Sequence, residues 1–331
     1  MNNTTSSAPL LVFRVLSNAA GLPAGLLVDA GPGSEAAWPD LFEDQYFGDL
    51  SAAIPCFYRE AASSVVAAAL AGAGWSALAS GALQREDERL VKEQLPPGAR
   101  LIEGDWYMAA PSKATGAQAA SRALALQLAA LVAADAHTHD IEALLRKDPT
   151  LSYHLLRLVN SLGMGVGRRI SSFSQAILIL GRQQLRRWVN LMLFSARQGD
   201  PRSGMLLARV AVRGRVLELL AKVRGADKQM QDQAFIAGMF SLLGVLFGMP
   251  LPEVLVPLSM SEAVQQALLG YEGDLGRMLR VCEAMERGDF GAIATHLEAL
   301  QVSCADYNAA LVEANYWMLG AIRGDQGGEH A

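Results

Sequence analysis

The chain has 331 residues, 51% of them hydrophobic, and its formal net charge at pH 7 is −5. A chain of this length and composition can bury two cores of ordinary size, so we expect two domains, each with its own core. The small acidic excess gives no overall argument for binding to nucleic acid or to an anionic membrane.

Cysteine usage and the apolar runs favour a soluble protein of the reducing cytoplasm. Cys56, Cys282 and Cys304 lie far apart without C-x-x-C spacing, so they predict neither a disulfide framework nor a zinc site. The first residues lack the charged region and long apolar core of a signal peptide. The longest apolar runs are shorter than the ~20 residues of a membrane span, or are interrupted by Gly and Pro. We therefore expect a cytoplasmic location.

Short apolar runs alternate with turn residues in the first third of the chain, which predicts a mixed α/β module over residues 1–113. The expected strands lie within residues 9–21, 26–29, 53–58 and 101–108. An alanine-rich helix is expected at 61–71, and the charged residues of 85–94 predict a surface helix.

Beyond residue 113 every long segment has helical periodicity, which predicts an all-α domain over residues 114–322 and a disordered tail at 323–331. The expected helices are 121–134, 140–146, 151–162, 174–180, 183–196, 205–224, 229–248, 261–269, 275–287, 290–300 and 307–322. The fold class is therefore α+β overall, with an all-α C-terminal bundle preceded by a smaller α/β module.

Residues 137–146, HTHDIEALLR, contain the His-Asp pair typical of HD phosphohydrolases. One such pair supplies too few ligands for a divalent ion, which needs further ligands from other helices. His137 is two residues from His139, so the two side chains would not share a helix face. We interpret the pair as a polar helix start, with Asp140 in the first turn, where its charge favours the helix dipole.

The same stretch contains EALLR, the letters of a cyclic di-GMP phosphodiesterase motif. In that family the Glu binds metal at the end of a barrel strand, with several more carboxylates around two metals. Glu142 instead belongs to a short predicted helix that ends at Asp148-Pro149. The downstream segments are helical and supply no paired acids, so no two-metal site is expected here.

A cluster of basic residues surrounds residues 174–193, which superficially look like a helix-turn-helix. The cluster contains Arg168, Arg169, Arg182, Arg186 and Arg187. The second helix, with Trp188 and several aliphatic neighbours, is too apolar to lie free in a DNA groove. We favour a solvated basic face that could serve as an interaction surface.

Residues 140–194 strongly resemble an HDOD domain, and the resemblance extends over about 114–320. It is carried by Asp148-Pro149, Leu155, the stretch 158–161, Ile170, Ser172, the stretch 175–177, Leu180-Gly181 and the stretch 185–188. This resemblance implies an HD-like helical bundle, related to the HD hydrolases, that lacks their metal ligands.

The same resemblance indicates where a metal site would lie in an active relative. Aligning Ala237-Gly238 with the corresponding helix of HD hydrolases places Ser241 and Leu242 at the His-Asp position. A leucine cannot bind a cation, and a serine alone binds one poorly. No catalytic, metal-binding or cofactor-binding residue is therefore expected, and no cofactor.

The chain looks most like the subgroup in which HDOD follows an EAL domain. Residues 99–111 resemble the final strand and turn of EAL, with Glu103 in place of the usual Gln. The remaining sequence before it shows no EAL ligand set and has about half the length of a full βα barrel, which spans ~250 residues. The resemblance thus implies a truncated, degenerate EAL-like module.

The expected function is non-catalytic signal transduction through a protein partner bound by the HDOD domain. The partner is not identified by the sequence, and pairing with a second copy stays open. Binding to nucleic acid, a membrane or cyclic di-GMP is not expected. Two alternatives are kept: a residual cyclic-dinucleotide phosphodiesterase or binder, and a nucleic-acid-binding regulator that uses the arginine cluster.

Overall fold

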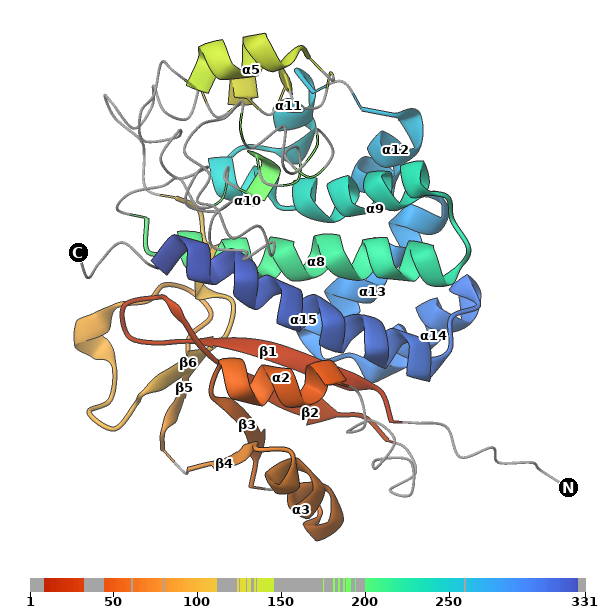
Figure 1. The fold of residues 1–331 in the computed structure, drawn as a ribbon. Coiled ribbons are helices and arrows are strands. Elements are labelled where there is room, and N and C mark those ends of the chain that lie inside the picture. Colours follow the sequence, from red (N-terminus) through yellow and green to blue (C-terminus); the bar gives the residue numbers. More distant parts are fainter. Residues whose placement is uncertain are drawn as a thin grey trace, which may run out of the picture.

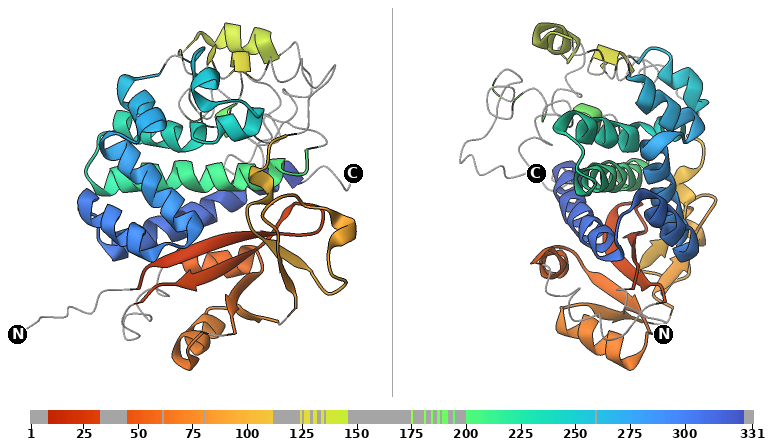
Figure 2. Two further views of the ribbon diagram at one scale, coloured as in Figure 1. Left: turned by 180° about the vertical axis from the view of Figure 1, so that it is seen from behind. Right: turned by 90° about the vertical axis from the view of Figure 1, so that its right-hand side faces the viewer.

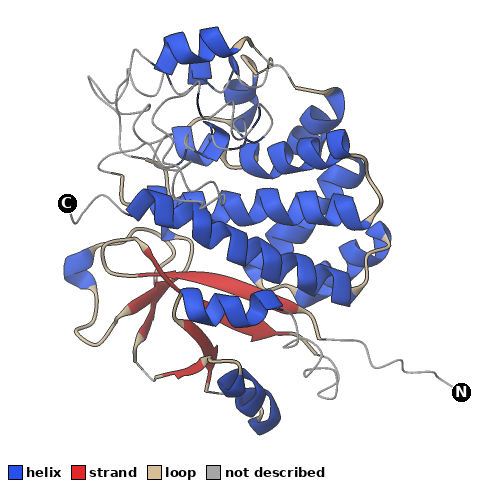
Figure 3. Ribbon diagram, viewed as in Figure 1, coloured by secondary structure: helices blue, strands red, loops and turns tan. Residues whose placement is uncertain are grey.

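A computed structural model of the chain describes residues 9–32, 45–60, 62–79, 81–111, 200–258 and 260–326, with parts of 124–145 and isolated positions between 175 and 194. Helices form one layer and a curled sheet forms the other (Figure 3). The right-hand view of Figure 2 shows the helical layer stacked on the sheet. The predicted α+β class, with a helical C-terminal part, is confirmed.

Six strands form the N-terminal sheet: β1 (Leu11–Ser17), β2 (Pro23–Ala30), β3 (Cys56–Arg59), β4 (Ser76–Leu78), β5 (Leu83–Arg85) and β6 (Leu101–Glu103). The described α-helices are α2 (Gln45–Ala53), α3 (Ser64–Gly72), α5 (Thr138–Leu145), α8 (Ser203–Val223), α9 (Lys228–Phe240), α10 (Leu243–Phe247), α11 (Leu251–Leu255), α12 (Glu262–Gly270), α13 (Gly273–Arg287), α14 (Phe290–Leu300) and α15 (Cys304–Gln326). Two short 3₁₀ helices are η2 (Lys92–Gln94) and η3 (Trp106–Met108).

The strand order is β4-β3-β2-β1-β6-β5. β1 is antiparallel to both of its neighbours, while β2, β3 and β4 are mutually parallel and β5 is parallel to β6. Five strands therefore run in one direction, and only β1 opposes them. The two edge strands β4 and β5 are separated by only four residues, 79–82. Such a short connection requires the sheet to curl until its edges approach each other (Figure 1).

The two faces of the curled sheet follow from the period-2 alternation of side chains along each strand. Leu16, Leu27, Leu78 and Leu101 come from four different strands and form a separate apolar cluster, with Phe57 and Leu83 packed against it. This cluster fills the inside of the curl. The alternate residues of β1, β2 and β6 belong instead to the large core that the sheet shares with the helices.

One continuous core joins the sheet to the helical layer, in addition to the separate apolar cluster inside the curl. The junction is also polar. The backbone N–H of Leu11 donates to Oδ1 of Asn308 (3.0 Å), and the Asn308 amide donates to the carbonyl of Pro9 (2.8 Å). The Tyr307 hydroxyl donates to the Leu11 carbonyl (3.2 Å). Among the described residues, β6 pairs with β1 at Ser17, the last residue of β1. The start of β1 therefore has no strand beside it on that side, and α15 supplies its hydrogen-bond partners there.

The centre of the helical layer is α8, which is buried along most of its length. It packs closely against α9 where two glycines face each other. A Cβ atom added to Gly238 would lie 2.6 Å from the backbone nitrogen of Gly214. The absence of side chains at these two positions therefore lets the helix backbones approach each other.

Several predicted boundaries differ from the structure. Residues 85–94 do not form a surface helix; they contain the end of β5 and η2, because Glu86 N–H bonds the Glu103 carbonyl and extends the pairing with β6. The single helix expected over 229–248 breaks at Ser241. α15 continues to Gln326, so the predicted disordered tail is wrong for residues 323–326. The helices expected over 151–162 and at 174–180 and 183–196 lie wholly or mostly outside the described residues.

One stretch of the described residues, Lys228–Phe247, is long and apolar enough to cross a membrane by length and composition. In the structure 56% of its most apolar window is buried. It also comprises two helices, α9 and α10, rather than one continuous span. It is a core segment of the helical layer.

The glycine contact gives a stability prediction. Replacing Gly238 with Ala should lower the free energy of unfolding by about 1–3 kcal/mol, because the new methyl group meets the rigid backbone of α8. Replacing Gly72 with Ala is the matched control, since a Cβ there meets nothing within 4 Å, and it should leave stability unchanged or slightly higher. Urea unfolding measures both. Equal stabilities of the two variants would contradict the close approach of α8 and α9.

Candidate functional site

Charged residues lie at one end of the curled sheet, here called its mouth. They stand two positions beyond residues of the inner apolar cluster in the same strands. Because strand residues alternate in facing, Asp29 follows Leu27 on the inner face of β2, and Glu103 follows Leu101 on the inner face of β6. Arg59 takes the same place at the end of β3, beyond Phe57. These positions are the carboxyl ends of strands that run in one direction, which is where βα barrels bind substrates and metals.

The carboxylates at this mouth are bound by arginines. Asp29 accepts hydrogen bonds from Nε of Arg14 and from Nε of Arg59, each at 2.9 Å. Nη2 of Arg59 also donates to Oε2 of Glu103 at 2.9 Å. Arg59 therefore bridges β2 and β6 across the curl, and the four residues together carry no formal net charge. Throughout this article they are called the strand-end cluster.

The strand-end cluster joins two guanidinium groups to two carboxylates. Arginine cannot be deprotonated in proteins, and its planar fork matches carboxylate geometry. Among the described residues, no group of three or more His, Cys, Asp or Glu is arranged to hold a metal ion. Glu103, predicted from resemblance to replace a Gln, is thus held by Arg59.

A second assembly lies between α8, α9 and α13. Arg213 binds Glu286 through two parallel hydrogen bonds, Nε to Oε1 at 2.6 Å and Nη2 to Oε2 at 2.7 Å. Its third nitrogen, Nη1, donates to Oγ of Ser241 at 2.7 Å. The Ser241 hydroxyl in turn donates to the carbonyl of Gly238 at 2.7 Å. The close approach at Gly238 therefore places Ser241 within reach of Arg213.

The charge state of this assembly follows from its surroundings. Burial alone would raise the pKa of Glu286, but the charges of Arg209 and Arg213 and the hydrogen bond from Arg213 outweigh it and lower the pKa below its usual value. Burial disfavours the charged form of Arg213, yet Glu286 raises its pKa above the ordinary value. The pair is therefore ionised.

Ser241 and Leu242, the residues at the predicted HD position, have different surroundings in the structure. Ser241 ends α9 and accepts its hydrogen bond from Arg213. Leu242 is buried in the core. The hydroxyl oxygen of Ser241 is therefore bound by an arginine. The predicted alignment of these two residues with a His-Asp pair stays a prediction.

The HTHDIEALLR residues lie apart from both assemblies. Asp140 is in the first turn of α5, as predicted, and its side chain is exposed beside that of His139, 3.7 Å away. Glu142 lies on the same short helix. The helix is at the far side of the helical layer from the sheet (Figure 1).

The predicted basic interaction surface is wrong for Arg187. Its side chain is only 9% exposed, and it donates two hydrogen bonds to Glu218 and one to Asp232. Its guanidinium also lies 4.7 Å from the centre of the Phe235 ring. Arg187 is therefore a buried structural residue, while Arg168, Arg169, Arg182 and Arg186 lie outside the described residues.

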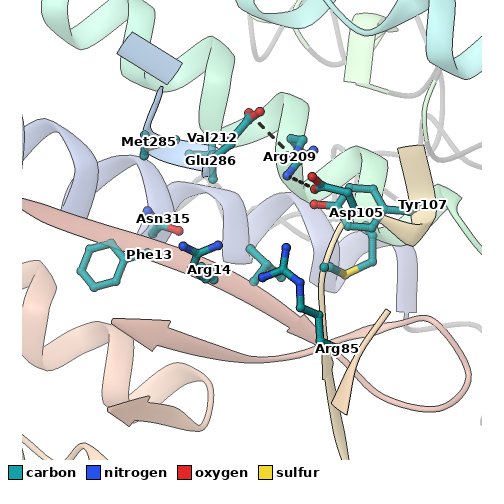
Figure 4. Close-up of a pocket in the computed structure, with 13 residues that line it drawn as sticks. Phe13, Arg14, Arg85, Asp105, Tyr107, Arg209, Val212, Met285, Glu286 and Asn315 are labelled. Atoms are coloured by element: carbon teal, nitrogen blue, oxygen red, sulfur yellow. Dashed lines mark hydrogen bonds and ion pairs between the residues drawn. The ribbon is translucent and has the colours of Figure 1, made fainter. Parts of the chain in front are cut away.

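A cavity of about 70 Å³ lies where β1, β5, α8 and α13 meet (Figure 4). Arg14, Arg85 and Arg209 line it together with Asp105 and Glu286. Arg209 joins the layers, because its Nη2 donates to Asp105 at 2.7 Å and its Nε lies 3.8 Å from Glu286. Its guanidinium also lies 4.8 Å from the centre of the Tyr107 ring.

Comparison with protein families identifies the helical part of the chain. Residues 121–269 match the HDOD domain family. The chain contains an HDOD domain. Among the helices described, the match covers α5 and α8 to α12. α13, α14 and α15 follow it, and α13 and α15 pack against β1 of the sheet. The sheet itself precedes the match.

Three known proteins are similar to parts of this chain. The cyclic di-GMP phosphodiesterase CdgJ of Vibrio cholerae is 32% identical over 177 residues, 54% of this chain and 40% of CdgJ. The uncharacterized protein YuxH of Bacillus subtilis is 29% identical over 148 residues, 44% of this chain and 36% of YuxH. A Shewanella amazonensis SB2B structure, described as a candidate phosphohydrolase, has a TM-score of 0.44 and 15% identity, covering 61% of this chain and 93% of that one. The chain spans less than half the length of CdgJ and YuxH.

Sequence analysis did not single out most of the residues that form these assemblies. A usable signal exists for the strand-end cluster, since apolar and charged residues two positions apart end β2, β3 and β6. Another signal is the pair Arg209 and Arg213, four residues apart and therefore on the same side of a largely buried helix of the HDOD domain. Their partner Glu286 is 73 residues from Arg213, and no local pattern connects the two.

The Arg213 assembly gives a second stability prediction. Replacing Arg213 with Ala should lower the free energy of unfolding by about 3–5 kcal/mol, because Glu286 loses its bidentate partner inside the protein. Replacing Ser241 with Ala should lower it by only about 1 kcal/mol, the contribution of one hydrogen bond.

Arg277 is the control for this comparison, because its ion pair with Asp274 is exposed on both sides. Replacing Arg277 with Ala should change stability by less than about 1 kcal/mol. Chemical denaturation followed by circular dichroism compares the three variants. Similar losses for Arg213→Ala and Arg277→Ala would show that Glu286 does not depend on Arg213.

Proposed function

We propose that the chain is a regulatory signalling protein that does not turn over a substrate and acts by binding a protein partner through its HDOD domain. The observation that carries this proposal is the pairing of arginine with carboxylate at the mouth of the sheet. Asp29 and Glu103 are the strand-end acids, and Arg14 and Arg59 already bind both of them.

The curled sheet supports a relationship to βα barrels. β2-α2-β3-α3-β4 forms two consecutive parallel βαβ units with neighbouring strands adjacent in the sheet, the repeat from which such barrels are built. Six strands replace eight, and β1 runs in the opposite direction. We interpret the module as a truncated, degenerate relative of the EAL barrel, in agreement with the resemblance of residues 99–111.

The similarity to CdgJ brings cyclic di-GMP signalling to this chain as the context in which it acts. Hydrolysis by two metals needs several free carboxylates around the ions. Here a metal would have to displace Arg59 from both Asp29 and Glu103, leaving a guanidinium without partners at the mouth of the sheet. These contacts therefore favour a module that has kept its fold and lost the hydrolysis of cyclic di-GMP.

We infer that the HDOD domain acts by binding another protein. Its buried residues Arg187 and Arg213 are held in internal ion pairs, and its described residues include no group of acids, histidines or cysteines that could hold a metal. A helical surface that performs no chemistry still serves to hold another protein. We place this action in the cytoplasm, in line with the free cysteines Cys56, Cys282 and Cys304.

The turnover claim is tested by incubating the purified full chain with cyclic di-GMP and Mg²⁺ or Mn²⁺, with CdgJ as the positive control. We expect no hydrolysis above the buffer blank, because the strand-end acids are bound by arginine. Product analysis by chromatography measures this. Hydrolysis that disappears in Glu103→Gln or Asp29→Asn would contradict the proposal, and loss in Glu142→Ala would restore the EALLR motif as a site.

A further inference from the structure

The cavity between the sheet and the helices is lined by three guanidinium groups that come from three different elements. Arg14 lies on β1, Arg85 ends β5 and Arg209 lies on α8. In Figure 4 the side chains of Arg14 and Arg85 rise from the strands toward the helices, where Arg209 lies. No element of the helical layer or of the sheet could form this lining by itself.

The guanidinium groups have hydrogen-bond donors to spare. Arg14 uses Nε for Asp29, and Arg85 uses Nε for Asp87. Within the described residues, no hydrogen bond occupies the Nη groups of these two side chains. Arg209 uses Nη2 for Asp105. Several N–H groups therefore remain available around one small space, and an arginine N–H group requires an acceptor.

The hydrogen-bond donors around the cavity suit an anion. Three guanidiniums and two carboxylates line it, and Asp29, Asp87 and Arg213 pair with members of this set just outside the lining. Both carboxylates are already held, Asp105 by Arg209 and Glu286 by Arg213. Donors that converge from three directions suit a tetrahedral oxyanion better than a planar carboxylate, and arginine binds phosphate in a bidentate manner.

The size of the cavity limits the ligand. A buried water needs roughly 10–15 Å³ of such space, so the cavity of about 70 Å³ holds about five waters. That is enough for one phosphoryl group and too little for a whole nucleotide. Arg85 is largely exposed at the rim, so an organic substituent on the phosphoryl group would project past it into solvent.

We propose that this cavity binds a single phosphoryl group, supplied by inorganic phosphate or by the end of a phosphomonoester. The bound group would accept hydrogen bonds from Arg14 and Arg85 of the sheet and from Arg209 of the HDOD domain. It would thereby strengthen the contact between the two layers. This binding site goes beyond the proposed function, which requires neither phosphate nor this cavity.

Isothermal titration calorimetry of the full chain with inorganic phosphate, in a chloride-poor zwitterionic buffer, tests the site. We expect one phosphate per chain. Arg85→Gln should weaken binding by about tenfold or more, because it removes charge-assisted hydrogen bonds. Its pair with Asp87 is exposed, so this variant should fold normally. Arg14→Gln should weaken binding similarly, while Arg59 still holds Asp29.

Arg277→Gln is the matched control, since Arg277 is an exposed arginine on α13 that does not line the cavity. Its phosphate affinity should equal that of the unmodified chain. Glycerol phosphate in a parallel titration distinguishes the source: tighter binding than phosphate indicates a phosphomonoester, and weaker binding indicates the free ion. Absence of binding, or equal weakening in Arg85→Gln and Arg277→Gln, would overturn the proposal without bearing on turnover or partner binding.

Discussion

The paired contact between Arg213 and Glu286 joins α8 and α13, two helices that both pack against β1 of the sheet. Arg213 belongs to the central helix α8, and Glu286 belongs to α13, which also packs against β1. Two short hydrogen bonds hold this pair inside the protein, where either charge alone would be expensive. Arg209, one helical turn earlier, contacts Glu286 on one side and Asp105, between β6 and η3, on the other.

The same chemistry recurs at the mouth of the curled sheet. Arg59 binds both Asp29 and Glu103, so one guanidinium neutralises acids that come from two different strands. A guanidinium supplies fixed charge and directional hydrogen bonds, but it offers no open coordination position to a water or a substrate. Under the proposed function, this arrangement keeps acidic side chains at strand ends in a stable fold without metal-dependent hydrolysis.

Much of the helical layer could be predicted from the sequence, because long amphipathic or apolar segments carry a strong periodic signal. The helices around α12, α13 and α14 lie within a few residues of their expected bounds. The shared core and the polar junction could not be predicted. Asn308 bonds a strand that lies 297 residues earlier in the chain, and a contact at such a distance leaves no local trace. The arginine cluster was misread at Arg187 because a charged residue was assumed to be solvated, whereas Glu218 and Asp232 hold it inside.

The most direct measurement is an anomalous-scattering experiment on crystals of the full chain soaked in Mn²⁺. If arginines have taken the place of metal ions, the map will show no manganese at Asp29, Glu103 or Ser241, and Arg59 and Arg213 will remain on their carboxylates. A manganese peak at coordination distance from Asp29 and Glu103, with Arg59 displaced, would contradict this account.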